Sequence, residues 1–319
     1  MAQAGQRFSL GREAGRDGRF HRQASAFRDR PERAEAGRYV LYVCRACPWA
    51  HRTIIARRLL GLEDAIELAE VDPIRDERGW AFTGGPYVDP HNGFRFLSEA
   101  YAATDPSFDG RYSVPVLWDK RAGRIVNNES GDLLRILNDD FRPLATTDVD
   151  LYPPDLRPEI EPLEERIYET LNNGVYRTGF ATTQEAYEEG FFPLFETLDW
   201  LEERLSRRRY LVDDERITAV DWRLFTTLVR FDSVYYLHFK CNRDRIVDLP
   251  ALWGYLRDLY QQPGIAETVD LDAIKRHYYG THGSINPHGI VPAGPRLDLS
   301  SPHGREALAA QRQDRTALA

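Results

Sequence analysis

The stretch from Tyr39 to Arg52 constrains the fold of this chain most, because it places a cysteine directly before a proline after an apolar run. The run Tyr39–Val43 has the composition of a β-strand, and apolar residues recur at helical spacing from Trp49 to Leu60, just before Gly61. Proline favours the first position of a helix, where its missing N–H would have no partner anyway. The sequence therefore predicts a strand, a short turn and a helix whose N-cap is Cys47.

Cys47 is a candidate nucleophile for a physical reason. A thiol at a helix N-terminus faces backbone N–H groups that have no partner within the helix, and it faces the positive end of the helix dipole. Both favour the thiolate over the thiol. The alternative is that Cys47 is an inert buried residue, which is the commoner role of a lone cysteine in a cytosolic chain.

The spacing of Cys44 and Cys47 also matches the C-x-x-C pattern of dithiol redox proteins. In that pattern the first cysteine caps the helix and the second lies inside it. Here the predicted cap is Cys47, and the position inside the helix is Ala50. We therefore expect a single working thiol, with Cys44 packed at the end of the strand.

Length and composition allow two globular domains: the chain has 319 residues, of which 42% are hydrophobic and 12% aromatic. Three cysteines cannot form a disulfide framework. No run approaches the roughly 18 to 20 apolar residues of a membrane span, and the first residues lack the apolar core of a signal peptide. A net charge of −8 argues against general nucleic-acid binding. We expect a cytoplasmic protein that contacts neither membranes nor nucleic acids.

The first half of the chain reads as an arm followed by an α/β domain. Phe8, Phe20 and Phe27 are the main apolar anchors of the arm, although the first fifteen or so residues fit a disordered tail equally well. Residues 65–71 alternate like a second strand, and residues 72–111 form an unusually long connection. Residues 112–119 and 124–127 read as a hairpin, in which Pro115 requires an edge position or a special turn and raises the possibility of a cis bond.

The second half is helical in pattern. A turn at residues 128–132 enters a helix and offers backbone N–H groups to a carboxylate. After a proline-rich linker, helical spacing recurs in residues 159–172, 185–206, 219–240 and 250–262. Thr218 and Asp221 fit a capping box. The predicted segments are an arm at 1–36, an α/β domain at 37–145, a linker at 146–158, a helical domain at 159–285 and a tail at 286–319.

Seven sequence blocks, in order, resemble glutathione transferases, and more narrowly the xi class, the glutathionyl-hydroquinone reductases. The resemblance spans residues 27–287. The blocks are residues 38–52, 79–80, 114–119, 127–130, 172–181, 230–232 together with 238–242, and 277–279. It implies an α/β thioredoxin-like N-terminal domain followed by an all-α C-terminal domain, and a homodimer.

The resemblance also implies roles for individual residues. Cys47 would be the nucleophile, and Tyr176, Tyr235 and Tyr278 would line the aromatic substrate pocket. We hypothesise in addition that Tyr176 donates a proton and that Tyr235 and Tyr278 favour the thiolate by hydrogen bonding; ordinary packing is the alternative for each tyrosine. The residues implied to hold glutathione are Trp80, Arg111, Tyr112, Ser113, Val114, Glu129 and Ser130. Gly131 departs from the family pattern, in which a second serine is common, and this leaves open which thiol is used.

The activity implied is the reduction of glutathionyl-hydroquinones by glutathione, or by a related low-molecular-weight thiol, through a mixed disulfide on Cys47. No tightly bound cofactor is expected. Pairs such as His277 with His282, or His238 with Cys241, lack the further ligands of a metal site, and we expect none. Two alternatives stay open: a conjugating glutathione transferase, which generally uses Ser or Tyr in place of cysteine, and a non-catalytic interaction module on the same fold.

Overall fold

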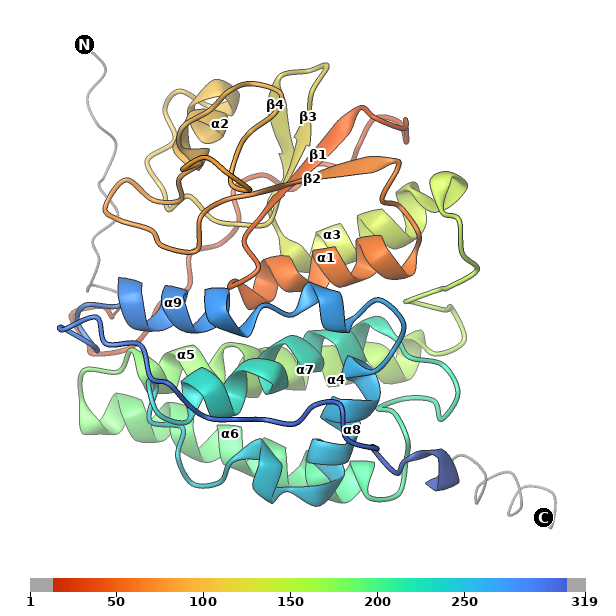
Figure 1. Cartoon of the computed structure of the whole chain (residues 1–319), viewed down its shortest axis with the longest axis vertical. Helices are drawn as coiled ribbons and strands as arrows, with labels where there is room; N and C mark the ends of the chain where they lie inside the picture. Colours follow the sequence, from red (N-terminus) through yellow and green to blue (C-terminus); the bar gives the residue numbers. More distant parts are fainter. Residues whose placement is uncertain (1–13, 309–319) are drawn as a thin grey trace. The chain divides into compact units, whose positions relative to one another are not determined.

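The structure is a computed structural model, and it describes residues 14–308 (Figure 1). These residues fall into two compact units, each of which is described by itself. The first unit contains Arg22–Asp150 and Thr268–Val291, and the second contains Ala14–His21, Leu151–Glu267 and the described part of Pro292–Ala319. Phe8, the first residues of the predicted arm and the end of the predicted tail lie outside the described residues. No helix within residues 14–308 is long and apolar enough to cross a bilayer.

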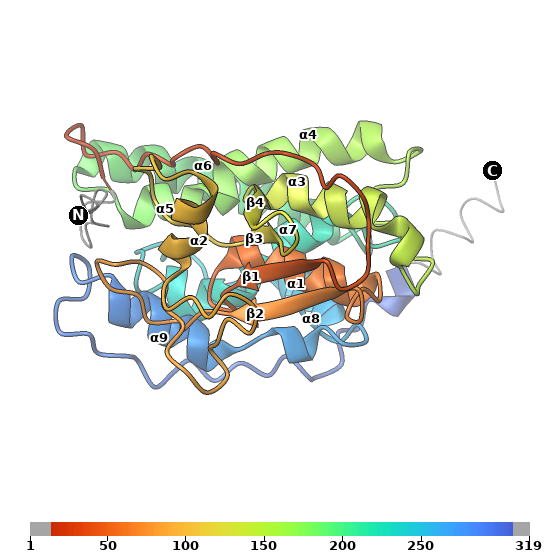
Figure 2. The same cartoon turned by 90° about the horizontal axis from the view of Figure 1, so that it is seen from above.

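A four-stranded sheet organises the first unit, with strand order β2-β1-β3-β4 (Figure 2). The strands are β1 (Tyr39–Val43), β2 (Ile66–Glu70), β3 (Val116–Asp119) and β4 (Arg124–Asn127). β1 pairs parallel with β2 and antiparallel with β3. All five residues of β1 are buried, as expected of an inner strand with an unbroken apolar run. Helices α1 and α3 lie on one face of the sheet, and α2 lies beside the β3–β4 hairpin (Figure 1).

Helix α1 (Pro48–Leu59) begins and ends where the sequence predicts. Cys47 is the N-cap, with extended backbone, and Pro48 is the first helical residue. At the other end, Gly61 adopts a φ of 63°, a left-handed conformation in which glycine carries no Cβ penalty. The strand, turn and helix predicted around Cys47 are therefore confirmed.

The predicted hairpin is shorter than expected, because its first strand begins at Val116 and not at residue 112. The Val114–Pro115 peptide bond is cis, as the sequence suggested it might be. Ser113 is held by Tyr101 instead of a neighbouring strand: its N–H donates to the Tyr101 hydroxyl at 3.1 Å, and its carbonyl accepts from that hydroxyl at 2.8 Å. The hydrogen-bond ladder of the hairpin ends here because Pro115 has no N–H to donate and because Ser113 bonds to a side chain instead of a strand.

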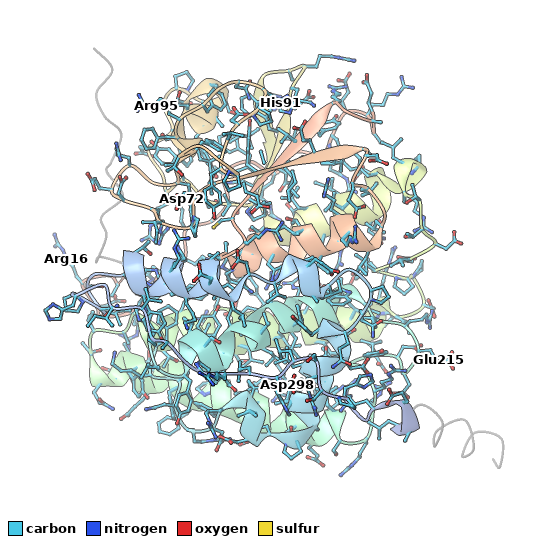
Figure 3. The ribbon with its side chains drawn as sticks, viewed as in Figure 1. Arg16, Asp72, His91, Arg95, Glu215 and Asp298 are labelled. Atoms are coloured by element: carbon cyan, nitrogen blue, oxygen red, sulfur yellow. The ribbon has the colours of Figure 1, made fainter. Side chains whose placement is uncertain are left out.

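The long connection between β2 and β3 contains a helix that the sequence analysis missed, α2 (Leu97–Thr104). Its start is fixed by Glu99, whose carboxylate accepts from the N–H groups of Arg95 and Phe96 at 2.8 and 2.9 Å. Asp72 and Arg95, both labelled in Figure 3, lie in this connection. The connection is closed by backbone hydrogen bonds, for example from Phe82 N–H to the Arg95 carbonyl, and by the Asp72 carboxylate, which accepts from the N–H of Ile74. The connection between β2 and β3 therefore has a defined backbone, although its apolar residues follow neither helical nor strand spacing.

The remaining helices of the first unit are short α3 and C-terminal α9. α3 (Ser130–Arg135) continues into a π-helical turn at Ile136–Asp140 and a 3-10 turn at Arg142–Leu144. α9 (Leu271–Thr281) begins with Asp270, whose carboxylate accepts from Ala273 N–H at 2.8 Å.

The second unit is helical throughout its core, so the predicted class, an α/β part and an all-helical part, is confirmed. Its helices are α4 (Arg157–Ile167), α5 (Gly174–Gly179), α6 (Gln184–Leu205), α7 (Ala219–Arg230) and α8 (Pro250–Tyr260). Short turns lie at Tyr168–Asn172, Phe231–Tyr235, Ile246–Asp248 and Ala266–Thr268; Thr268 is the first residue of the segment Thr268–Val291, which belongs to the first unit. The predicted capping box of α7 is present, but the helix expected to reach residue 240 ends with the π-helical turn at Tyr235.

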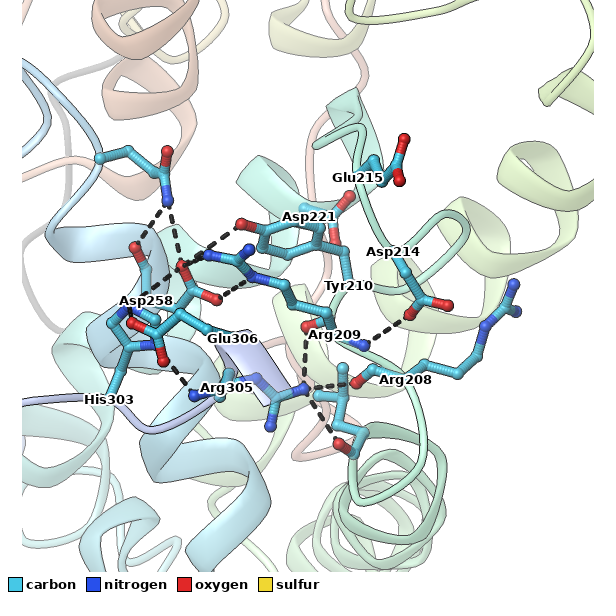
Figure 4. A network of polar contacts seen from close by, with 12 residues as sticks. Arg208, Arg209, Tyr210, Asp214, Glu215, Asp221, Asp258, His303, Arg305 and Glu306 are labelled. Carbon is cyan, nitrogen blue, oxygen red and sulfur yellow. Dashed lines mark hydrogen bonds and ion pairs between the residues drawn. The ribbon is translucent and has the colours of Figure 1, made fainter. Parts of the chain in front are cut away.

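A buried polar network fixes the C-terminal segment to the second unit (Figure 4). The guanidinium of Arg305 donates to the carbonyl oxygens of Leu205 and Arg209, at 2.9 and 2.8 Å, where α6 ends. Arg209 in turn donates to the fully buried carboxylate of Asp258 at 2.8 Å. Residues 292–305 have no regular secondary structure, as expected for the tail, yet these bonds hold the segment in place.

Candidate active site

Cys47 lies where the end of β1, the start of α1 and the Val114–Pro115 turn meet. Its side chain is 8% exposed, and its Sγ directs the thiol hydrogen to the Val114 carbonyl oxygen, 3.6 Å away. As the N-cap, it stands at the positive end of the α1 dipole. The helix dipole favours the thiolate, whereas the bond to the Val114 carbonyl favours the neutral thiol.

Cys44 has a different environment. It follows β1 directly, is 1% exposed, and lies outside the helix cap. Burial raises the pKa of the Cys44 thiol well above its ordinary value, and the nearby Cys47 raises that pKa further. Cys44 is therefore a neutral thiol at physiological pH. It lacks the helix N-terminus that Cys47 faces as the N-cap of α1.

The segment before Pro115 is held by the body of the first unit. Ser113 shares its hydroxyl with Tyr101, 3.1 Å away, and the Tyr112 ring packs edge-on against the Tyr101 ring with centroids 5.4 Å apart. Arg111 N–H donates to the side-chain carbonyl of Gln23 at 2.8 Å. The Tyr101 hydroxyl also accepts from Asn128 at 3.0 Å. These contacts fix the backbone that leads to Val114, and they engage the Ser113 hydroxyl internally.

Glu129 and Ser130 lie at the start of α3. The Glu129 carboxylate accepts from the N–H of Gly131 at 3.1 Å and from the Ser25 hydroxyl at 2.8 Å. The Ser130 hydroxyl, in a residue that is 3% exposed, accepts from the guanidinium of Arg52 at 3.4 Å. A carboxylate next to a hydroxyl and a buried guanidinium forms a pair of sites of opposite charge. Such a pair suits the ammonium and carboxylate of an amino acid.

Trp80 is fixed between two side chains. Its indole stacks on the His277 ring, with centroids 5.0 Å apart and planes 23° apart, and the Arg75 guanidinium lies 5.3 Å from the indole centroid. His277 donates from Nδ1 to the Pro73 carbonyl at 2.7 Å, which anchors α9 beside the connection that carries Trp80. Tyr278, the next residue of α9, is 1% exposed and belongs to the same unit as Cys47.

The other two predicted tyrosines, Tyr176 and Tyr235, meet in the second unit, with ring centroids 6.2 Å apart. Tyr235 is fully buried, whereas Tyr176 is partly exposed. Phe239 joins them, lying 5.5 Å from each ring. Close packing explains Gly179, because a Cβ at this position would lie 2.1 Å from the Phe239 ring.

Several groups that shape these sites carry no direct signal in the sequence. Ser25 on Glu129, His277 on Trp80 and Phe239 beside the tyrosines are contacts between residues far apart in the chain. The available signal was indirect: His277 and Phe239 lie inside blocks that the sequence analysis singled out. Ser25 lies in the arm, where only phenylalanines were named.

Models of one family match the chain in two places. The model described as glutathione S-transferase, N-terminal domain, matches residues 46–140, and the model described as glutathione S-transferase, C-terminal domain, matches residues 184–258. The first match contains Cys47 and Glu129, and the second contains Tyr235.

Similar proteins carry names from the same family. The glutathionyl-hydroquinone reductase PcpF of Sphingobium chlorophenolicum is 52% identical over 88% of this chain and 91% of its own length. The glutathionyl-hydroquinone reductase YqjG of Escherichia coli is 48% identical over 91% of this chain and 93% of its own. A glutathione-bound structure of YqjG has a TM-score of 0.84 at 50% identity, covering 86% of this chain and 90% of that one. A xi-class glutathione transferase from Natrialba magadii has a TM-score of 0.86 at 47% identity, covering 88% and 89%.

Proposed function

We propose a function for this chain, which belongs to the glutathione transferase family and, within it, to the xi class. It reduces glutathionyl-hydroquinones to hydroquinones, with glutathione as the reductant and glutathione disulfide as the second product. The observation that carries this proposal is the residue at the N-cap of α1, a cysteine. A conjugating transferase must leave the glutathione thiolate free to attack its electrophile, and a cysteine at this position would capture glutathione as a mixed disulfide.

The first step is attack of the Cys47 thiolate on the sulfur of the glutathionyl-hydroquinone. The S–S bond of a Cys47–glutathione disulfide forms and the bond between sulfur and ring carbon breaks, so that carbon takes the electron pair and needs a proton. A keto tautomer of the hydroquinone makes that carbon a better leaving group, because the C–S bond then lies next to a carbonyl. In the second step, a free glutathione thiolate attacks the mixed disulfide, releases glutathione disulfide and restores Cys47.

Tyr176 is the proton donor in this scheme. Among the three tyrosines assigned to the substrate it is the partly exposed one, while Tyr235 and Tyr278 are 0% and 1% exposed. A donor must reach the ring carbon, whereas buried phenols serve as walls and as hydrogen-bond donors to a thiolate. Because general-acid catalysis typically contributes about 10²- to 10⁴-fold, Tyr176→Phe should lower turnover of glutathionyl-hydroquinone by that order.

Glutathione is held in this proposal by the first unit. Glu129 binds the γ-glutamyl ammonium, and Ser130, with Arg52 behind it, binds the γ-glutamyl carboxylate. The backbone of Val114 pairs with the peptide next to the cis-Pro115 turn, and Trp80, Arg111, Tyr112 and Ser113 complete the site. Since the Ser113 hydroxyl is already bonded to Tyr101, Ser113 contributes through its backbone and its place in the turn.

The proposal extends to the setting of the enzyme. Cys44, Cys47 and Cys241 are buried and form no disulfide, which suits a reducing compartment such as the cytoplasm. The assembly is a homodimer, as is usual in this family, and light scattering of the purified protein checks its mass.

Steady-state reduction of a glutathionyl-hydroquinone tests the proposed function. The wild type should turn over with glutathione, Cys47→Ala should show no turnover, and Cys44→Ser should keep the activity of the wild type. Parallel assays with other low-molecular-weight thiols identify the reductant. Absence of turnover in the wild type, together with conjugation of glutathione to an electrophile, would support the conjugating alternative instead.

A further inference from the structure

The arm segment Ala14–His21 forms a closed turn in the second unit. Ala14 and Phe20 make an antiparallel bridge, and Gly15 N–H donates to the Arg19 carbonyl at 2.8 Å. Gly18 closes the turn with a φ of 78°, a left-handed conformation. The segment thus has a defined backbone that fixes the direction of the Phe20 side chain.

Three contacts dock this turn at the start of α6. The N–H of Thr182 donates to the Gly18 carbonyl at 3.0 Å. The guanidinium of Arg19 makes a bidentate pair with Glu189, at 2.7 and 2.8 Å, and a third bond to Glu185 at 3.1 Å. The hydrogen bonds from Arg19 lower the pKa of Glu189, so this pair is ionised at physiological pH. Space is tight as well, because a Cβ on Gly18 would lie 2.7 Å from the Thr183 side chain.

The docked turn places Phe20 against an aromatic cluster that consists of Tyr176, Phe180, Tyr235 and Phe239. The Phe20 ring stacks on Tyr176, with centroids 5.8 Å and planes 28° apart, and on Phe180, at 5.7 Å and 22°. Tyr176 and Phe180 are themselves stacked at 6.2 Å. Phe20 is therefore stacked on the Tyr176 ring, whereas Phe239 contacts that ring edge-on and Tyr235 contacts it at a tilt.

We propose that Phe20 is a positioning residue for the reduction of glutathionyl-hydroquinones: it acts through Tyr176, whose phenol it holds at the angle needed to protonate the leaving ring carbon. This inference rests on the proposed function. With Phe20 absent, the Tyr176 ring gains freedom about its χ angles and spends less time in the productive geometry. Attack of Cys47 on a disulfide needs no proton from Tyr176, so formation of the mixed disulfide from glutathione disulfide does not depend on Phe20.

A kinetic double-mutant cycle tests this coupling. Phe20→Ala should lower kcat for a glutathionyl-hydroquinone between about 10- and 100-fold, the cost of misplacing a reacting group by a fraction of an ångström to 1 Å. The KM should change less than about threefold, because binding is largely retained. In the Tyr176→Phe background the same change should lower kcat less than about twofold. An undiminished effect in that background would overturn the proposal.

Three further variants separate positioning from general damage. Phe20→Tyr keeps the stacked ring and should restore most of the kcat. Gly18→Ala, which touches no ring of the cluster, should reproduce the loss by displacing the turn. Phe192→Ala removes an aromatic ring of α6 that is 63% exposed and should behave as the wild type. Equal losses in Phe20→Tyr and Phe20→Ala would contradict the role assigned to the ring.

A spectroscopic measurement tests the same contact without turnover. A 3-fluorotyrosine placed at position 176 should give a ¹⁹F resonance that shifts in Phe20→Ala and Gly18→Ala and stays in place in Phe192→Ala. A resonance unaffected by Phe20→Ala would refute the stacking, whatever the activity. If the resonance shifts while the wild type lacks turnover, the contact is real and the proposed function fails.

Discussion

Asp221 offers a stringent test of the packing of the second unit. It lies in the first turn of α7 and is fully buried. One carboxylate oxygen accepts from Leu211 N–H at 2.9 Å and from the Tyr255 hydroxyl at 2.8 Å. The other accepts from the N–H and the hydroxyl of Thr218, both at 2.9 Å. Four donors thus converge on one side chain.

The change Asp221→Asn keeps the shape of this side chain and reverses the polarity of half of it. If the new NH₂ replaces the first oxygen, it faces the N–H of Leu211. If it replaces the second, it faces the N–H of Thr218. A backbone N–H cannot turn away, so either orientation leaves one buried donor unsatisfied, which costs about 1–3 kcal/mol. Burial raises the pKa of Asp221, so the folded chain already disfavours the negative charge and its loss adds no further cost. We expect a destabilisation of about 1–3 kcal/mol, a sizeable part of the stability of a typical domain.

Urea denaturation followed by circular dichroism measures this free-energy change from the shift in midpoint at an unchanged slope. Asp270→Asn is the matched control, because Asp270 caps α9 in a partly exposed position and asparagine caps helices as well as aspartate does. The control should change the free energy of unfolding by less than about 0.5 kcal/mol. If Asp221→Asn cost no more than Asp270→Asn, the account of four converging hydrogen bonds would be refuted.

Two further predictions follow from single groups. Glu129→Gln removes the negative charge assigned to the γ-glutamyl ammonium. The KM for glutathione should therefore rise by about tenfold or more, which is the equivalent of one charge-assisted hydrogen bond. The control Glu188→Gln, at an exposed position, should leave this KM unchanged. An unaltered KM in Glu129→Gln would contradict the assignment. Burial lowers the pKa of His238 from 6.5 to about 4. As pH falls, the imidazole is therefore protonated in the unfolded chain before it is protonated in the folded chain. The free energy of unfolding consequently decreases as pH falls from about 6.5 through 4. Between about pH 7.5 and 5 the wild type should lose about 2 kcal/mol more than His238→Gln in urea titrations, and equal losses would count against a neutral buried imidazole.

The sequence predicted best those features that local chemistry determines. Proline is favoured at the first position of a helix, so the capping position of Cys47, just before Pro48, followed from neighbouring residues alone. The same holds for Thr218 and Asp221, three residues apart in a capping box. The side-chain contacts of Glu129 and Ser130 with the arm and with Arg52 were not foreseen, although their place at a helix start was.

Contacts between distant segments could not be predicted, because no periodicity records them. The bond between His277 and Pro73 joins residues 204 positions apart, and it supports the residue that stacks on Trp80. Phe20 was recognised as an anchor of the arm, but its partner was one of sixteen tyrosines. Helix α2 escaped prediction for a related reason: it is eight residues long and lies in a segment rich in proline and glycine.

In the proposed mechanism one thiol, that of Cys47, carries glutathione as a mixed disulfide. Intact-protein mass spectrometry after incubation with glutathione disulfide detects such an adduct, and peptide mapping locates it. We predict one glutathionyl group on Cys47 in the wild type and in Cys44→Ser, removable by dithiothreitol, and none in Cys47→Ala. An adduct on Cys44, a disulfide between Cys44 and Cys47, or an unmodified wild type would contradict the monothiol mechanism.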